Sequence, residues 1–536
     1  MTTCQIRLAQ CSNGYDRAFH AGKARYPVNP MQPALELIDI DKRFGTVHAN
    51  NRVSLRVHAA SVHGVVGENG AGKSTLMSIV YGFYEADSGE IRVKENRVRI
   101  RSSQDAISVG IGMVHQHFML VETMTVLENI ILGAEGGAFL AKGEHKARKA
   151  LKDLGERYGL VVDPDALVGD LTVGLQQRVE IIKVLYRGAD ILILDEPTAV
   201  LTPSEADQLF ELTKALKAQG KTVILITHKL REIMLATDTV SVMRRGEMAA
   251  TLETAKTTPA EIAEAMVGRR VLLKVEKKPP SFGRVLLDVQ NLTVKDGFGV
   301  TRVDGATFKI HAGEIVGIAA VSSNGQSELL EALSGMRKAT GRFCVDGEAV
   351  DLAHPDPSLM RDLKVFHVPE DRHRCGLVLP FDAAESGILG HHYEGGAARG
   401  FLIDRTEMAK AQAEKMEAYD VRPPIPDLKT SKFSGGNQQK IVLAREMERN
   451  PSVLLIGQPT RGVDIGAIEF IHKRIIAMRD AGKAILLVSV ELEEIMSLSD
   501  RIIAMCGGKI TGERIPSQTN ERELGLLMAG IDSEAV

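Results

Sequence analysis

The chain contains one segment twice, and this internal duplication constrains its fold more than any other feature of the 536 residues. The apolar run VHGVVG at 62–67 and the run EIVGIAA at 314–320 each precede a loop of small residues and then a helical pattern. Farther on, DILILDEPT at 190–198 aligns with SVLLIGQPT at 452–460, and each leads into a helical pattern, a Gly-Lys turn and another apolar run. A unit of ~250 residues therefore occurs twice.

Each unit alternates short apolar runs with amphipathic helical patterns, which predicts an α/β sheet in both. The charged stretch KKPPSFG at 277–283, rich in proline and glycine, predicts the joint between them. We expect an N-terminal tail at 1–32, a first domain at 33–272, a linker at 273–284 and a second domain at 285–536. The tail has no apolar periodicity, so we expect it to be disordered or to precede a true start at Met31, with a transit peptide as the alternative.

Charge and composition exclude several classes of function. Sixty-six Lys and Arg against 69 Asp and Glu give a net charge of −3, unlike the strongly basic proteins that bind nucleic acid. Aromatic residues make up 4% and Trp is absent, which argues against a stacking platform for single strands. No run approaches the ~18 apolar residues of a membrane-spanning helix. The five scattered cysteines predict a reducing compartment without a disulfide framework.

A phosphate-binding loop is predicted between an apolar strand and a helix early in the first unit. The segment GENGAGKS at 67–74 fits the pattern G-x-x-x-x-G-K-[ST]. Its glycines let backbone N–H groups curl around phosphates, Lys73 reaches the terminal phosphates, and the Ser74 hydroxyl ligates Mg²⁺. The nucleotide-binding residues predicted here are Gly67, Glu68, Asn69, Gly70, Ala71, Gly72, Lys73, Ser74 and Thr75.

Two acids end another apolar run of the first unit, at Asp195 and Glu196. A carboxylate at a strand end can hold the Mg²⁺ of a phosphate-loop site. The second acid, Glu196, can polarise an attacking water as the general base. Acids at a strand end are weak evidence alone, but together with the phosphate loop they predict nucleotide hydrolysis.

Taken in order, these motifs resemble those of the ATP-binding-cassette (ABC) ATPases that carry two cassettes in one chain. The resemblance covers roughly residues 33–531. It implies a tandem pair of α/β P-loop NTPase cassettes, each with a RecA-like core, an antiparallel β subdomain and a helical signature subdomain. It also implies that ATP and Mg²⁺ are bound, with Ser74, Gln116 and Asp195 around the metal.

The resemblance assigns further roles in the first unit. Gln116 matches the Q-loop, which senses the metal and the membrane partner, and His228 matches the switch histidine. Phe44 matches the aromatic residue that stacks on adenine, although a buried strand aromatic is the alternative. The run LTVGLQQ at 171–177 stands where the family has its LSGGQ signature, and Thr202 stands at the D-loop acid.

The second unit departs from the pattern where the chemistry lies. Gln326 stands in place of Lys73 and precedes Ser327, while Gly457 and Gln458 replace Asp195 and Glu196. Glu370 occupies the Q-loop position and Val490 that of the switch histidine. The second unit nevertheless keeps a good signature and its D-loop acid, at Ser434, Gly435, Gly436, Asn437, Gln438 and Asp464.

In the family, cassettes pair head to tail, and each ATP lies between the phosphate loop of one cassette and the signature of the other. Sorted in this way, every defect falls in one site. The loop and acids of the first unit face the intact signature of the second, while the altered loop faces the eroded signature. The resemblance therefore implies one hydrolytic site, with Glu196 and His228 catalytic, and one degenerate site.

The phrases EIIKVLYRGADILILDEPTAVLTP, SSNGQSELLEAL and VPEDRHRCGLVL resemble the duplicated ATPase subunits of bacterial sugar and nucleoside importers. This likeness implies two transmembrane permease subunits and, indirectly, a substrate-binding lipoprotein or periplasmic protein, with no nucleic-acid partner. It places the chain at the cytoplasmic face of the inner membrane, with segments 124–129 and 381–386 facing the permeases. The alternatives are a soluble tandem ATPase acting on ribosomes or nucleic acid and a scaffold without ATPase activity.

Overall fold

The computed structural model of the protein describes residues 32–45, 47–115, 118–134, 140–198, 201, 203–270, 276–321, 324–392, 398–399, 402–463 and 465–531. The predictions made for the tail at 1–31 and for Gln116, Thr202 and Asp464 lie outside these residues. The chain divides into two compact units, unit 1 (Met1–Arg270) and unit 2 (Val271–Val536).

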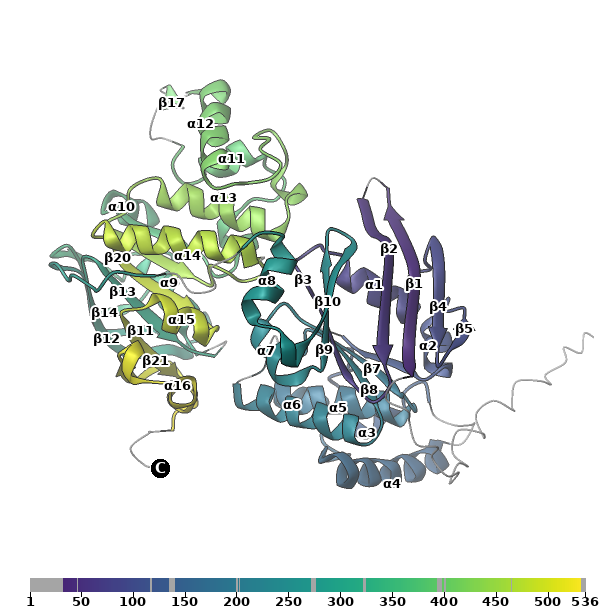
Figure 1. The fold of residues 1–536 in the computed structure, drawn as a ribbon. Coiled ribbons are helices and arrows are strands. Elements are labelled where there is room, and N and C mark those ends of the chain that lie inside the picture. The colour runs from purple at the N-terminus through teal and green to yellow at the C-terminus, as the bar shows by residue number, and fades with distance from the viewer. Residues whose placement is uncertain are drawn as a thin grey trace, which may run out of the picture. The chain divides into compact units, whose positions relative to one another are not determined.

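Two sheets form unit 1 (Figure 1). Within its described residues, one sheet has the order β10-β9-β3-β8-β7-β6, with β10 antiparallel at one edge and the other strands parallel. The second sheet is antiparallel, in the order β2-β1-β4-β5. The strands are β1 (Pro33–Phe44), β2 (Val47–His58), β3 (Val62–Gly67), β4 (Ser88–Val93), β5 (Asn96–Val98), β6 (Ile111–Val114), β7 (Ile191–Asp195), β8 (Thr222–Ile226), β9 (Thr239–Arg244) and β10 (Glu247–Glu253).

Helices and the second sheet cover both faces of the parallel sheet, which explains why its strands are continuous apolar runs. Along β7, Ile191 and Ile193 join the core shared with β1, β2 and α1, whereas Leu192 and Leu194 join the core under α3, α4, α5 and α6. The helices of unit 1 are α1 (Lys73–Val80), α2 (Ser103–Ser108), α3 (Val126–Ile131), α4 (Leu140–Tyr158), α5 (Val173–Tyr186), α6 (Pro203–Ala218), α7 (Leu230–Ala236) and α8 (Pro259–Val267).

The two main sheets of unit 2 repeat this topology strand for strand. Its parallel sheet has the order β16-β19-β20-β13-β21-β22, which matches β6-β7-β8-β3-β9-β10 of unit 1, and its antiparallel sheet has the order β12-β11-β14-β15. The short strands β17 (Ala398–Arg399) and β18 (Leu402–Ile403) pair with each other. The others are β11 (Val285–Lys295), β12 (Thr301–His311), β13 (Glu314–Ala319), β14 (Thr340–Val345), β15 (Glu348–Val350), β16 (Val365–Val368), β19 (Val453–Gly457), β20 (Ala484–Ser489), β21 (Arg501–Cys506) and β22 (Lys509–Arg514).

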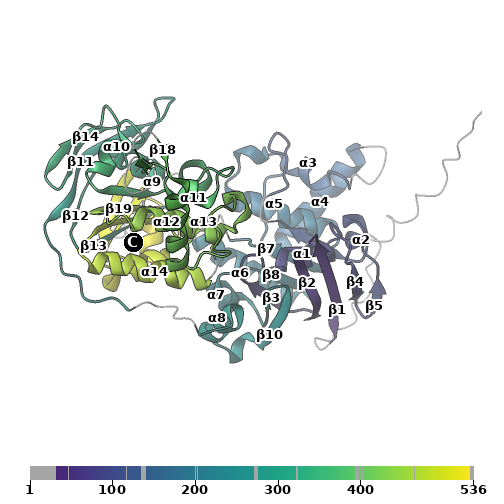
Figure 2. The same cartoon turned by 90° about the horizontal axis from the view of Figure 1, so that it is seen from above.

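The helices of unit 2 fill the same places in the order of the chain. In Figure 2, α11, α12 and α13 gather beside the sheet, and the three helices contact one another. They form the helical subdomain of the unit, as α3, α4 and α5 do in unit 1. The helices are α9 (Gln326–Leu333), α10 (Pro357–Asp362), α11 (Ala383–Gly387), α12 (Arg405–Ala418), α13 (Gly435–Met447), α14 (Ile465–Asp480), α15 (Leu492–Leu498) and α16 (Glu521–Met528).

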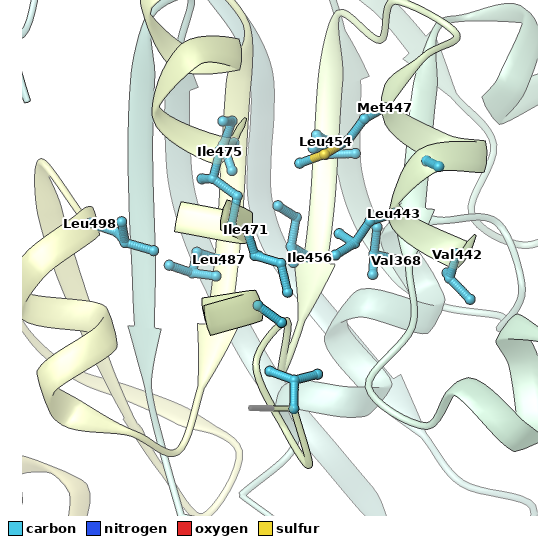
Figure 3. Packing of buried hydrophobic residues seen from close by; sticks show 14 of the residues in the cluster. Val368, Val442, Leu443, Met447, Leu454, Ile456, Ile471, Ile475, Leu487 and Leu498 are labelled. Atoms are coloured by element: carbon cyan, nitrogen blue, oxygen red, sulfur yellow. The ribbon is translucent and has the colours of Figure 1, made fainter. Parts of the chain in front are cut away.

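The core of unit 2 binds the helical subdomain to the sheet. Figure 3 shows Leu454 of β19 beside Met447 of α13 and Ile456 of β19 toward Leu443 of α13, with Ile471 of α14 close to Leu487 of β20. These side chains are buried, and burial of each large aliphatic side chain contributes roughly 1.5–3 kcal/mol. The signature helix is therefore held firmly to the strand whose end carries the residues matching the catalytic acids.

The predicted α/β sheet in each unit is confirmed, and so is the duplication, because the strand orders are the same. None of the helices formed by the described residues combines the length and the apolar character needed to cross a lipid bilayer.

Candidate functional site

Three neighbouring strands of unit 1 bring the predicted catalytic residues to one edge of the sheet. The phosphate loop follows β3, Asp195 is the last residue of β7, and His228 follows β8. Since β3 and β7 flank β8 and all three run parallel, their carboxyl ends meet at the same edge. Ligands of open α/β sheets bind at this edge.

A glycine and a lysine hold the phosphate loop in shape. Gly72 has a φ of +98°, and an atom at its Cβ position would lie 2.3 Å from the carbonyl oxygen of Ala49, so only glycine fits. Lys73, the first residue of α1, is 6% exposed. Its ammonium group donates to the carbonyl oxygens of Gly67 at 2.6 Å and Glu68 at 3.0 Å. The loop therefore presents a curled backbone with one buried cation.

Glu196 and His228 form a hydrogen-bonded pair. The His228 Nδ1–H donates to Oε1 of Glu196 at 2.9 Å, and this bond is the main cause that lowers the pKa of Glu196. The carboxylate is thus ionised at neutral pH, as a general base must be. Glu196 has a φ of +44°, so the chain turns sharply immediately after the strand ends.

Of the residues predicted to hold Mg²⁺, the two that the structure describes, Ser74 and Asp195, suit a cation. Burial, and then the charge of Glu196, raises the pKa of Asp195 to about 6, while Lys73 opposes the rise. A carboxylate that is costly to ionise gains from a metal ion beside it. Ser74 is exposed on the first turn of α1, where its hydroxyl can reach a ligand.

Phe44 is the last residue of β1 and is 42% exposed, so its ring is not a buried strand aromatic. The ring packs edge-on against Tyr84, with centroids 5.1 Å apart, and the Lys42 ammonium lies 5.5 Å from its centroid. Tyr84 is 45% exposed as well, so both rings of the pair are partly open to solvent.

At Gly325 and Gln326, the altered loop of unit 2 keeps the backbone of the intact one. Gly325 has a φ of +93°, and an atom at its Cβ position would lie 2.1 Å from the Arg302 carbonyl oxygen. Gln326 begins α9 as Lys73 begins α1, and Gln458 has a φ of +48°, close to that of Glu196. At these positions, the substitutions therefore change the chemistry and leave the backbone conformation in place.

The signature residues of unit 2 begin helix α13. Ser434 is the N-cap, and its hydroxyl accepts hydrogen bonds from the backbone N–H and the side-chain amide of Asn437. Gln438 donates to the Thr430 carbonyl oxygen, while Gly436 is buried in the first turn. In unit 1, Thr172 is the N-cap of α5, and its side chain makes no capping bond.

Charged side chains that the sequence analysis missed lie beside the two signatures. In unit 2, Arg372 stands next to Gly435, whose Cβ position lies 2.7 Å from the guanidinium Nη2. Arg372 also donates to the Arg461 carbonyl oxygen at 3.1 Å. In unit 1, a carboxylate lies beside a different signature glycine, since Oε1 of Glu205 is close to the Cβ position of Gly174, the equivalent of Gly436. A cationic side chain therefore borders the signature of unit 2, and an anionic one borders the signature of unit 1.

This contrast was not visible in the sequence because the charges come from other elements. Arg372 lies in the π-helical turn Arg372–Gly376, and Glu205 lies in the first turn of α6. A cavity of about 960 Å³ in unit 1 is lined by residues of α5 and α6, Gly174 and Glu205 among them. It flanks the eroded signature rather than the phosphate loop.

An ion pair in unit 1 ties the signature helix to the segment that follows the Q-loop. Oε1 of Glu180 accepts from the Met119 backbone N–H and from the Lys183 ammonium, both at 2.8 Å. The same ammonium donates to the Met119 carbonyl oxygen at 3.0 Å. In unit 2, Arg445 of α13 donates to the carbonyl oxygens of Gly376 at 2.8 Å and Ser386 at 3.1 Å.

Comparison with known proteins agrees with these motifs. The family model described as ABC transporter matches residues 50–199 and again 303–461. The nucleoside import ATP-binding protein NupA of Lactococcus lactis subsp. cremoris is 46% identical over 504 residues, which cover 93% of this chain and 98% of the relative. The guanosine import ATP-binding protein NupO of Bacillus subtilis is 47% identical over 501 residues, with coverages of 93% and 98%.

Among solved structures, a chain from the complex of archaeal ribosomal stalk protein aP1 with the ribosome recycling factor aABCE1 has a TM-score of 0.56. It is 18% identical, and the match covers 87% of each chain. At that identity the likeness shows the fold alone.

Proposed function

The chain belongs to the ABC transporter family, and on that premise we propose that it energises the import of nucleosides, with simple sugars as the other substrate class. Hydrolysis of ATP by such a chain is coupled to transport. The names of the two relatives with 46% and 47% identity favour nucleosides. The ribosomal alternative has no support beyond a shared fold.

At the hydrolytic site, unit 1 supplies the residues that bind and react. Lys73 and the loop amides hold the phosphates, and Phe44 stacks on adenine. Glu196 takes a proton from the attacking water, while His228 orients the Glu196 carboxylate. Bound Mg²⁺ would be held by Ser74, Gln116 and Asp195 and would neutralise charge on the phosphates. The raised pKa of Asp195 supports this assignment.

The observation that carries the proposal is the way in which the defects are distributed. Lysine, both acids and the histidine are present in unit 1, and the signature with its capping serine is present in unit 2. We assign the signature of unit 2 to the ATP of unit 1, with the cassettes pairing within the chain and Asp464 completing that signature. The charges support the same assignment, because Arg372 would attract a triphosphate and Glu205 would repel one.

The partners proposed are two permease subunits and, through them, a substrate-binding lipoprotein or periplasmic protein, at the cytoplasmic face of the inner membrane. Thr125 and Asp382 support matching roles for the two docking segments. Each caps a helix through a complete capping box, at α3 in unit 1 and at α11 in unit 2. Hydrogen bonds connect these regions to the signature helices: Glu180 and Lys183 of α5 bond to the Met119 backbone ahead of the first segment, and Arg445 of α13 donates to the Ser386 carbonyl oxygen in the second.

The test compares Ser434→Ala with Thr172→Ala, which remove the hydroxyl of each signature, together with one methyl group at Thr172. We expect the steady-state rate of phosphate release to fall severalfold or more for the first, beyond what its melting temperature explains, because Ser434 also caps α13. The rate of the second should stay near wild type. Equal rates in the two variants would remove the assignment of the unit 2 signature to the unit 1 ATP. Uptake of labelled nucleoside by vesicles that contain the chain and its permeases tests the substrate class.

A further inference from the structure

We propose that Arg372 is a positioning residue for ATP hydrolysis, which holds the signature of unit 2 to the segment 461–463 that leads to its D-loop acid. The inference rests on the proposed function, in which this signature serves the ATP of unit 1. It assigns a role to a side chain that belongs to neither motif. The contacts that carry it all lie among described residues of unit 2.

The guanidinium of Arg372 lies between two segments of unit 2. Its Nη1 donates to the Arg461 carbonyl oxygen at 3.1 Å, and its Nη2 lies 2.7 Å from the Cβ position of Gly435 and 3.6 Å from that of Gly462. The Nε–H points toward Oε1 of Gln438 at a distance of 3.4 Å. One planar group therefore contacts both the first turn of the signature helix and the segment 461–463.

Two glycines make room for this guanidinium. A Cβ atom at Gly435 would overlap Nη2 of Arg372, so any other residue there would displace the guanidinium. The same Cβ position lies 3.3 Å from the Gly462 carbonyl oxygen, which shows how closely the two segments approach. Gly462 has a φ of +69°, a conformation that favours glycine. Arg372 and the two glycines therefore form one packed group.

Unit 1 differs from unit 2 at all three positions of this group. In the duplicated segment they are Phe118, counted from the Q-loop position, Val173 and Val200. A valine at the first glycine position would fill the space that the guanidinium takes in unit 2. The arginine and its two glycines thus occur together with the intact signature, and three apolar residues occur with the eroded one. This joint change indicates that the group serves the signature.

The turn that carries Arg372 is fixed to the signature helix α13 at both ends. At its start, the Nε2–H of His373 donates to Oε1 of Gln438 at 2.8 Å. At its end, Arg445 of α13 donates to the Gly376 carbonyl oxygen at 2.8 Å. Short π-helical turns of this kind are frequent at functional sites. The backbone of Arg372 therefore has a defined place relative to α13, from which its side chain reaches the segment 461–463.

A fixed distance between the two segments matters because both act on one ATP in the proposed function. Ser434 begins the signature helix, and Asp464 directly follows the segment 461–463 in the sequence. A misplacement of about 1 Å can cost on the order of 10²-fold in rate. Arginine suits this task, since its planar fork donates in fixed directions, whereas the ammonium of lysine is a point charge on a flexible stem. Binding of ATP should depend instead on Lys73 and its loop.

The experiment measures steady-state phosphate release and the melting temperature of the full chain with Arg372→Ala or Arg372→Lys. We expect kcat to fall about tenfold or more in both variants, with KM for ATP changed less than about threefold. Lysine should not restore the rate, because one ammonium cannot occupy both places of the fork. The control is Arg374→Ala, which removes the same charge from the same turn at a side chain that is 70% exposed, and it should keep the wild-type rate.

Gly435→Ala gives a second measurement of the same contact. Its methyl group should displace the guanidinium, so it should lower kcat as Arg372→Ala does and add little to the loss in an Arg372→Ala chain. Additive losses, a kcat of Arg372→Ala or Arg372→Lys within about threefold of wild type, or a loss that only follows the melting temperature would overturn the inference. The proposed function fails separately, if Ser434→Ala and Thr172→Ala release phosphate at equal rates.

Discussion

Replacing Glu196 by glutamine isolates the chemical step, because unit 2 already shows that glutamine fits. Gln458 occupies the equivalent position with a φ of +48°, against +44° for Glu196, so the substitution imposes no new backbone conformation. The remaining carbonyl oxygen can still accept from His228 Nδ1, which now lies 2.9 Å from the carboxylate. General bases contribute about 10²- to 10⁴-fold, so we expect phosphate release to fall by that factor, or about 3–5 kcal/mol in activation free energy.

The assay is steady-state phosphate release with saturating ATP and Mg²⁺, beside the melting temperature of each variant. Nucleotide affinity should be kept, since the base does not hold the phosphates. The matched control is Gln458→Glu, which restores an acid to unit 2 but should leave the rate of Glu196→Gln unchanged. A Glu196→Gln chain that hydrolyses ATP within about tenfold of wild type would refute the role of Glu196 as general base.

Three other perturbations have expected outcomes. Because the pKa of Asp195 is raised to about 6 from 3.8, its ionisation destabilises the fold as pH rises, with no effect below pH 3.8 and up to about 3 kcal/mol above pH 6. Without nucleotide, Asp195→Asn should therefore have a higher melting temperature than wild type at pH 8, and this difference should be smaller at pH 5. A difference at pH 5 that equals or exceeds the one at pH 8 would contradict the prediction. Lys183→Met should cost about 3 kcal/mol in unfolding titrations, because it leaves the buried charge of Glu180 without a cation, and the further change Glu180→Leu should recover most of that loss. A Lys183→Met chain as stable as wild type would show that the ion pair is dispensable. Deleting residues 1–30 should change neither the ATPase rate nor the melting temperature, since no motif lies there, and a large loss of either would count against that view.

The motifs that consist of consecutive residues could be predicted from the sequence. The phosphate loop, the strand-end acids and the signature of unit 2 each occupy a few consecutive positions, and their order along the chain was enough to name them. Strand order was not predictable, because alternating patterns do not say which strand lies beside which. Its repetition in unit 2 was expected only through the duplication.

Contacts between distant segments were beyond sequence reasoning. Nothing in the sequence indicated that Glu205 lies against Gly174 or Arg372 against Gly435, since each pair joins two different elements. The contact of Ser327 with Glu370 likewise depends on the closeness of the Q-loop to Gly457. The functions of Asp464 and Gln116 remain predictions from the family pattern.

Two units of the same topology on one chain also alter how the protein can change in evolution. In a homodimer of single cassettes both subunits have the same sequence, so any substitution appears in both of its sites. Here a substitution reaches one loop or one signature only, which allowed Gly457 and Glu370 to change while Asp195 stayed. Every copy of the gene then delivers one loop of each kind, and their ratio does not depend on expression level or on the choice of partner during assembly.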